Sequence, residues 1–141
     1  MDSGSESELT GEKVKDEIDK AEVKRDGLHG FVAYKKSVAL FDLVVADLDP
    51  LVGRFELTRL ISQQLARADS IAANIEEGYG RGSKKDYSHF LIIAQGSAQE
   101  TMGRYGRLKH WIDPKIVEQR INLCGEIVAI LTASIRKLRS I

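Results

Sequence analysis

The sequence predicts an all-α protein, an antiparallel up-down-up-down four-helix bundle that follows a disordered acidic N-terminal arm. Three observations predict this fold. Apolar residues recur at steps of three and four along four long segments, which places them on one face of a helix in each segment. No segment alternates apolar and polar residues with the period of two that marks a β-strand. The connections between most of these segments are short, and short connections make neighbouring helices antiparallel.

The predicted arm covers residues 1–27, and the predicted bundle domain covers residues 28–141. The arm holds nine acidic and five basic residues, whereas the rest of the chain holds 12 and 16, so a formal net charge of zero hides a basic body. The opening Asp-Ser-Gly-Ser-Glu-Ser-Glu is typical of disorder. Val14 and Ile18 have the spacing of a weak helix, but its apolar face is too thin to be stable alone.

The first helix is expected at residues 31–48. Its apolar stripe consists of residues at steps of three and four, namely Tyr34, Val38, Phe41, Val45 and Leu48. Asp49-Pro50 ends the helix, because proline disfavours helical geometry in the residue before it. We expect this stripe to face the core.

The second helix is expected at residues 56–77, with Gly78 as its left-handed C-terminal cap. The apolar stripe comprises Leu57, Ile61, Leu65, Ala68, Ala72 and Ile75. A polar stripe with small members lies beside it and comprises Gln63, Arg67, Ser70, Asn74 and Glu77. The next four residues, 79–82, hold too much glycine to be helical, so we expect the turn there.

The third helix is expected to begin at Ser83, whose hydroxyl caps it in a capping box with Asp86, and to continue to about Leu108. Its apolar face comprises Tyr87, Phe90, Leu91, Ala94, Ala98, Thr101, Met102, Tyr105 and Leu108. Three glycines interrupt the helix at positions 96, 103 and 106, and each costs about 1 kcal/mol against alanine. Either the helix bends there or another backbone approaches closely.

The fourth helix is expected to begin at Asp113-Pro114, with aspartate as the N-cap and proline at the first helical position. It extends to about Leu138. Its inward residues are Val117, Ile121, Cys124, Val128, Leu131 and Ile135.

Composition argues against several kinds of protein. Cys124 is the only cysteine, which excludes an intrachain disulfide and a cysteine-based metal site and favours a buried thiol. His29, His89 and His110 match no ligand spacing, so we expect no metal and no cofactor. No stretch reaches the ~18 apolar residues of a membrane helix. The polar acidic start resembles no signal peptide, so we expect a cytoplasmic protein.

A distinctive pattern occupies the second and third helices. It comprises Arg67-Ala68, Ser70-Ile71, Asn74-Ile75, Glu77-Gly78-Tyr79-Gly80-Arg81, Phe90-Leu91, Ala94, Gly96-Ser97 and Glu100. The pattern resembles that of the bacterial four-helix bundle proteins encoded in intervening sequences of large-subunit ribosomal RNA genes. The resemblance covers residues 31–140, and Tyr34 stands where the family usually has tryptophan.

The resemblance implies a ring-shaped homo-oligomer, typically a pentamer, and no defined activity. A distant relative is the accessory protein of diversity-generating retroelements, a basic pentamer that binds a reverse transcriptase and nucleic acid. This chain departs from the family at Asp69, at Glu76 and at Ala72-Ala73, where a proline is often found. The two added acids argue against an anion-binding role inherited from relatives.

One set of candidate residues forms the family motif, which we interpret as an assembly seam. It comprises Arg67, Ser70, Asn74, Glu77, Gly78, Gly80, Gly96, Ser97 and Glu100. Antiparallel pairing about the turn predicts Arg67 near Ala94 and Gln64 near Ser97, a polar stripe against small residues. That arrangement suits a helix–helix or subunit contact with buried hydrogen bonds. No nucleophile–base–orienter set is visible, so we expect no catalytic residues.

A second set consists of basic residues that could contact nucleic acid, namely Arg81, Lys84, Lys85, Arg104, Arg107 and Lys109. The glycine-rich turn before Lys84 is not a Walker motif, because the preceding strand is missing and the spacing is wrong. We group Arg136, Lys137 and Arg139 of the last helix with the cluster at 104–109. Trp111, between the third and fourth helices, is interpreted as a core plug rather than a base-stacking platform.

The leading hypothesis is a non-enzymatic, homo-oligomeric bundle that acts as an interaction or scaffold protein associated with RNA or ribosomes. The alternative is a protein-only assembly subunit or accessory factor. It would dock a partner protein, such as a nucleic-acid-processing enzyme, through the acidic arm. Neither an enzyme nor a membrane protein is expected.

Overall fold

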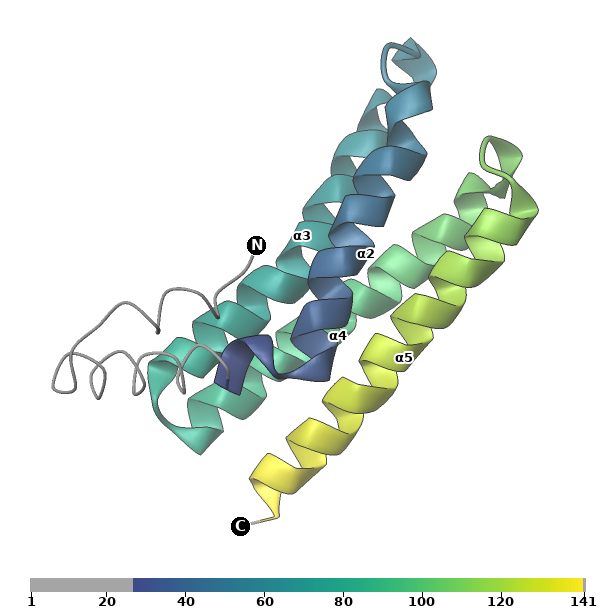
Figure 1. Cartoon of the computed structure of the whole chain (residues 1–141). Helices are drawn as coiled ribbons and strands as arrows, with labels where there is room; N and C mark the ends of the chain where they lie inside the picture. Colours follow the sequence, from purple (N-terminus) through teal and green to yellow (C-terminus); the bar gives the residue numbers. More distant parts are fainter. Residues whose placement is uncertain (1–26, 141) are drawn as a thin grey trace, which may run out of the picture. The chain divides into compact units, whose positions relative to one another are not determined.

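The computed structural model describes residues 27–140 and confirms an all-α bundle. The chain divides into two compact units, residues 1–31 and Val32–Ile141. The second unit contains four long helices, α2 (Val32–Leu48), α3 (Thr58–Arg81), α4 (Lys84–Arg107) and α5 (Pro114–Arg139) (Figure 1). Short 3-10 turns connect them, η2 (Asp49–Leu51), η3 (Phe55–Leu57) and η4 (Leu108–His110). The arm predicted at residues 1–27 lies, apart from Gly27, outside the described residues.

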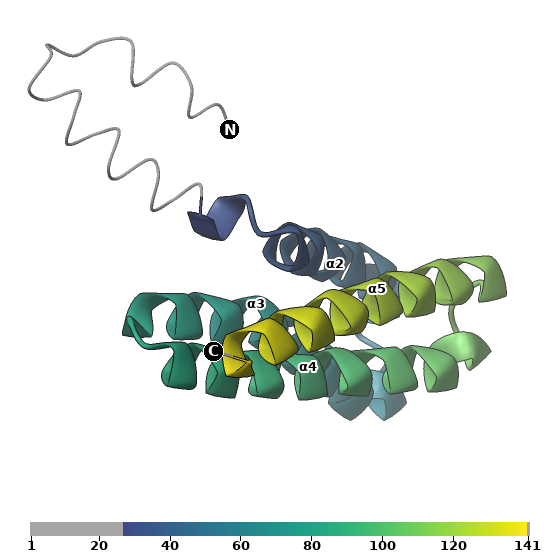
Figure 2. The ribbon, with the colours of Figure 1, turned by 90° about the horizontal axis from the view of Figure 1, so that it is seen from below.

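The four helices alternate in direction, so the predicted up-down-up-down arrangement is confirmed (Figure 1). Each helix packs against the next along the chain, and α2 also packs against α5 (Figure 2). Contacts are extensive between α3 and α4 and between α4 and α5, whereas α2 is attached less extensively to its neighbours. The helix α4 therefore lies at the centre of the packing.

The cap residues at the later helix starts agree with the sequence. The hydroxyl of Ser83 accepts a hydrogen bond from the backbone N–H of Asp86 at 3.1 Å. The carboxylate of Asp113 accepts one from the backbone N–H of Lys115 at 2.8 Å, with Pro114 in the first turn. These side chains satisfy backbone donors that a helix N-terminus leaves unpaired.

The end predicted for the second helix was wrong. Helix α3 continues through Gly78 and Gly80 to Arg81, and its cap is Gly82, with φ of +85°. That left-handed conformation is the one that glycine adopts without steric cost. The helix gains one turn over the prediction, and the turn between α3 and α4 shortens to Gly82 and Ser83.

The core face predicted for the first helix was also wrong. The buried residues of α2 are Ala33, Ser37, Leu40, Val44 and Leu48. Of the predicted stripe only Leu48 is buried, while Val38 and Val45 are 40% and 45% exposed. Helix α2 is apolar on two adjacent stripes, and a spacing of three and four residues fits both of them. The stripe with the smaller residues at its start is the one that packs inward.

Of two predictions about single residues, one is confirmed and one is wrong. Cys124 is fully buried, as predicted, and this burial raises the pKa of its thiol to about 12. Trp111 is 36% exposed, so its interpretation as a core plug was wrong. Within residues 27–140 no helix is long and apolar enough to cross a membrane.

Candidate functional site

The polar residues of the family motif lie between α3 and α4. The Ser97 hydroxyl donates to the Ser70 hydroxyl oxygen at 2.9 Å. The Asn74 side-chain amide donates to the same oxygen at 2.9 Å and to the Ser70 carbonyl at 2.8 Å. Ser70 thus links a residue on its own helix to one on α4. These polar residues of the predicted seam therefore join two helices of one chain.

Further polar contacts between α3 and α4, made by residues outside the predicted seam, lie nearer the start of α3. Gln64 is fully buried, and its side-chain amide donates to the Thr101 carbonyl at 3.0 Å. Arg104 reaches back to donate to the side-chain oxygens of Gln64 and Gln63, both at 3.4 Å. Burial, with a contribution from Arg107, lowers the pKa of Arg104. Arg104 therefore contributes to the contact between α3 and α4. Its guanidinium is less available to a partner than the sequence suggested.

The register of the seam differs from the prediction. Arg67 pairs with Glu100 at 3.9 Å, and Gln64 with Thr101, whereas the predicted neighbours were Ala94 and Ser97. The shift follows from the extra turn of α3, because a turn placed later along the chain moves every antiparallel partner on α4 later as well. The polar-against-small arrangement survives, with Ser70 facing Ser97.

Gly78 has a packing role in place of the predicted cap. A Cβ atom at this position would lie 2.8 Å from the Phe90 Cβ and 3.0 Å from a ring carbon of Tyr87. Only glycine lets α3 and α4 approach this closely. At Gly80 and Gly96 a Cβ would meet nothing within 4 Å, so no described residue explains these two glycines by close approach.

Arg81 was predicted to contact nucleic acid, but it is already engaged by its own helix. Its guanidinium pairs with Glu77 one turn earlier, at 2.9 Å. It also lies over the Phe90 ring, 5.1 Å from the centroid, in a cation–π contact. Arg81 thus helps to hold the end of α3 on α4, and its charge is balanced locally.

Several basic side chains gather where α4 begins and α5 ends. A hollow of about 410 Å³ is lined there by Lys84, Lys85, Ser88, His89, Leu138 and Arg139. We call these six residues the cationic end. Within residues 27–140, none of the four basic side chains takes part in an ion pair. The hollow therefore brings two predicted nucleic-acid contacts, Lys84 and Lys85, together with Arg139 and His89. The sequence analysis had placed Arg139 in another cluster and had not proposed His89 as a contact.

The predicted grouping of the other basic residues was wrong. Arg139 lines the hollow with Lys84 and Lys85, because α5 runs antiparallel to α4 and ends where α4 begins. The sequence had grouped it with Arg107 and Lys109, which lie at the opposite end of α4. The length of α4 between Lys85 and Arg107 is about 33 Å at 1.5 Å per residue. The six predicted contacts thus form no continuous patch.

A buried cluster that the sequence did not reveal joins three helices. Asp47 of α2 accepts hydrogen bonds from the Tyr105 hydroxyl at 2.7 Å and from the Arg120 guanidinium at 2.8 and 3.1 Å. Burial, strengthened by the bond to Asp47, raises the pKa of Tyr105. Tyr105 is fully buried, so the cluster presents no reactive group to a substrate. No spacing in the sequence links these three residues.

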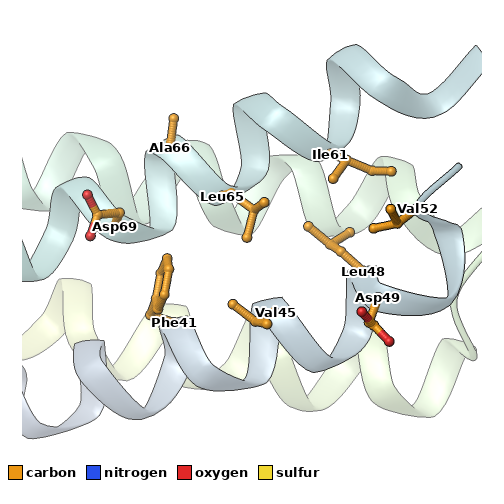
Figure 3. Close-up of a pocket in the computed structure, with 9 residues that line it drawn as sticks. All are labelled: Phe41, Val45, Leu48, Asp49, Val52, Ile61, Leu65, Ala66 and Asp69. Carbon is orange, nitrogen blue, oxygen red and sulfur yellow. The ribbon is translucent and has the colours of Figure 1, made fainter. Parts of the chain in front are cut away.

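The exposed stripe of α2 borders an apolar groove. It has a volume of about 450 Å³ and is lined by Phe41, Val45, Leu48, Asp49, Val52, Ile61, Leu65, Ala66 and Asp69. Figure 3 shows apolar side chains from α2 and α3 pointing toward one another, with Asp69 and Asp49 near opposite ends. Val52 is 65% exposed, and Phe55 just beyond it is 91% exposed. The groove and its surroundings therefore expose apolar surface that a folded monomer usually buries.

Two further observations concern the polar side chains of residues 27–140. Within residues 27–140 there is no group of three His, Cys, Asp or Glu side chains that could hold a metal ion. Every buried side-chain nitrogen and oxygen among the described residues has a hydrogen-bond partner. The cationic end and the apolar groove are two hollows on the surface of the described residues.

Comparison with known protein families gives a match over most of the chain. No curated protein matches the chain. The family model described as "23S rRNA-intervening sequence protein" matches residues 30–133, which include all four long helices up to the last turns of α5. Because this match covers well over half of the sequence, the chain belongs to the 23S rRNA-intervening sequence protein family.

Proposed function

We propose that this protein is a non-enzymatic RNA-binding bundle that contacts phosphates through its cationic end. The observation that carries the proposal is the meeting of Lys84, Lys85, His89 and Arg139 around one hollow without an ion pair among the described residues. The family is not a known enzyme family, and its description names a ribosomal RNA, which makes RNA the first partner to test. We expect the protein to act in the cytoplasm.

The position of the lysines supports an anionic partner. Lys84 and Lys85 occupy the first turn of α4, where the helix dipole is positive and favours negative charge. Both lysines therefore oppose the dipole. Asp86 lies in the same turn, but neither lysine forms an ion pair among the described residues. A phosphate group placed in the hollow would interact favourably with the lysines, with Arg139 and with the start of α4.

The test is RNA binding by charge-reversed variants. A fluorescently labelled RNA hairpin would be titrated with wild type and with the Lys84→Glu/Lys85→Glu double variant, and its anisotropy recorded at low and moderate salt. We expect salt-dependent binding by wild type and a loss of roughly tenfold or more in the variant, because phosphate contacts dominate such binding.

The matched control is Arg54→Glu/Arg59→Glu, which reverses two exposed charges near the start of α3. It should bind nearly as well as wild type. Equal losses in the two double variants would show that only overall charge matters, and an absence of RNA binding by wild type would contradict the proposal.

A specific observation also favours self-association. We propose that the apolar groove between α2 and α3 is covered by another copy of the chain in a homo-oligomer, with five copies expected from the family resemblance. The support is the exposure of Val45 and Val52 along a groove whose lining is apolar except for Asp49 and Asp69. An oligomer would also repeat the cationic end, which strengthens binding to a long RNA by multivalency.

Light scattering tests the assembly. Wild type should have the mass of several chains, and Val45→Glu should reduce it toward that of one chain, because a charge would be buried in an apolar contact. Ala39→Glu is the control, since Ala39 is exposed on the same helix but does not line the groove. A monomeric wild type, or an oligomer that Val45→Glu leaves intact, would contradict this assignment.

A further inference from the structure

The corner between α4 and α5 holds a tryptophan on the surface. Leu108 and Ile112 are 1% and 7% exposed, whereas Trp111 between them is 36% exposed. The backbone N–H groups of Trp111 and Ile112 both donate to the Leu108 carbonyl, at 2.9 and 3.0 Å. The corner is thus anchored by buried side chains on either side of the indole. The backbone at Trp111 is held in place, and the residue itself is partly exposed.

A second aromatic ring packs against this indole, and several exposed cations lie close to it in the sequence. The His110 ring lies 5.5 Å from the Trp111 ring, centroid to centroid, in an edge-on arrangement. Arg107 and Lys109 are exposed just before the pair, and Lys115 is exposed just after it. Between residues 104 and 115 the only acid is Asp113, and its carboxylate caps α5.

We propose that this corner is a stacking platform for an unpaired RNA base. The Trp111 indole would contact the face of the base, and Arg107, Lys109 and Lys115 would hold the flanking phosphates. Aromatic side chains next to cations are the usual means of binding single-stranded nucleic acid, because every base offers a π-face and every linkage a charge. This inference rests on the proposed RNA binding and names the part of the RNA that the corner recognises.

The corner and the cationic end lie at opposite ends of α4. The corner is about 33 Å from the cationic end when the length of α4 is taken at 1.5 Å per residue. One RNA molecule would therefore contact the phosphate site at the cationic end and the stacking site at the corner with different parts of its length. A paired region suits the cationic end, which has no exposed aromatic ring except His89 in its lining. An unpaired region suits the corner.

Trp111 reports on its own site, because it is the only tryptophan in the chain. The experiment titrates the full-length protein with a labelled oligouridine and, separately, with a blunt RNA duplex of the same length. Tryptophan emission and the anisotropy of the label are recorded together. We expect oligouridine to quench the emission and the duplex to bind without quenching.

Variants at the corner separate stacking from simple contact. Trp111→Leu should weaken oligouridine binding by about tenfold, within the range measured for removal of one stacking residue, and leave duplex binding unchanged. Trp111→Phe should keep most of the affinity, since phenylalanine retains a π-face. Phe55→Leu is the control, because Phe55 is 91% exposed at a different corner.

The outcomes distinguish this inference from the proposed function. Anisotropy that rises without any change in emission overturns the stacking platform and leaves RNA binding intact. Equal quenching by duplex and oligouridine overturns it too. If polyglutamate, titrated as an acidic polypeptide probe, quenched the emission while neither RNA quenched it or showed a rise in anisotropy, both the stacking platform and the proposed RNA binding would be overturned. Lys84→Glu/Lys85→Glu should weaken duplex binding yet keep full quenching at saturating oligouridine.

Discussion

The interior polar contacts and the cationic end differ in whether their polar side chains bond to other side chains within residues 27–140. In the interior, Ser70 bonds to Asn74 and Ser97, and Asp47 bonds to Tyr105 and Arg120. At the cationic end, the basic groups share a hollow without an ion pair among the described residues. The side chains of the first set bond to one another and stabilise the fold, whereas those of the second set are exposed and available to an external anion. The two regions should therefore respond differently to mutation.

The largest effect is expected from the buried ion pair. Asp47→Ala should lower the free energy of unfolding by about 3–5 kcal/mol, because it leaves the Arg120 charge and the Tyr105 hydroxyl without their partner. Asp42→Ala on the same helix is the control, since Asp42 is exposed, and it should change stability by less than about 0.5 kcal/mol.

Chemical denaturation measures both values, and RNA affinity is measured where both variants are still folded. Asp47→Ala should bind RNA as wild type does. A variant that is fully stable but defective in RNA binding would place Asp47 in the binding surface and break the distinction between the two regions.

A smaller effect is expected at Gly78, where α3 and α4 approach closely. Gly78→Ala should destabilise the bundle by about 1–3 kcal/mol, because its Cβ would lie 2.8 Å from the Phe90 Cβ and the helices would have to separate. Gly80→Ala is the matched control on the same helix, where a Cβ meets nothing. It should stabilise the helix by about 0.5–1 kcal/mol.

Thermal unfolding followed by circular dichroism would give the two shifts. Opposite signs would confirm that Gly78 serves close packing. If both alanines were neutral, the packing role assigned to Gly78 would be incorrect.

Much of the fold could be predicted from local chemistry. The caps Ser83 and Asp113 and the proline at 114 act through neighbouring backbone groups, so the sequence alone locates two helix starts. The all-α class follows from the apolar spacing. The end of α3 was missed because a glycine can be a cap or a packing residue, and only the presence of Phe90 opposite Gly78 decides between them.

The candidate site was harder to predict, because it depends on contacts between distant parts of the chain. Arg139 joins Lys84 only through the antiparallel packing of α5 on α4, and Arg81 is removed from the set by Glu77 and Phe90. The groove was missed because the outer stripe of α2 is as apolar as a core face. Its exposure is a property of the packed bundle.

The most direct test of the central claim is the salt dependence of RNA binding. The logarithm of the association constant would be plotted against the logarithm of salt concentration for wild type and for Lys84→Gln/Lys85→Gln/Arg139→Gln, with Gly78→Ala as the interior comparison. We predict a slope flatter by about two to three in the triple variant, because each phosphate that is no longer neutralised lowers the slope by about one, and an unchanged slope in Gly78→Ala. An unchanged slope in the triple variant would contradict the assignment of phosphate binding to the cationic end.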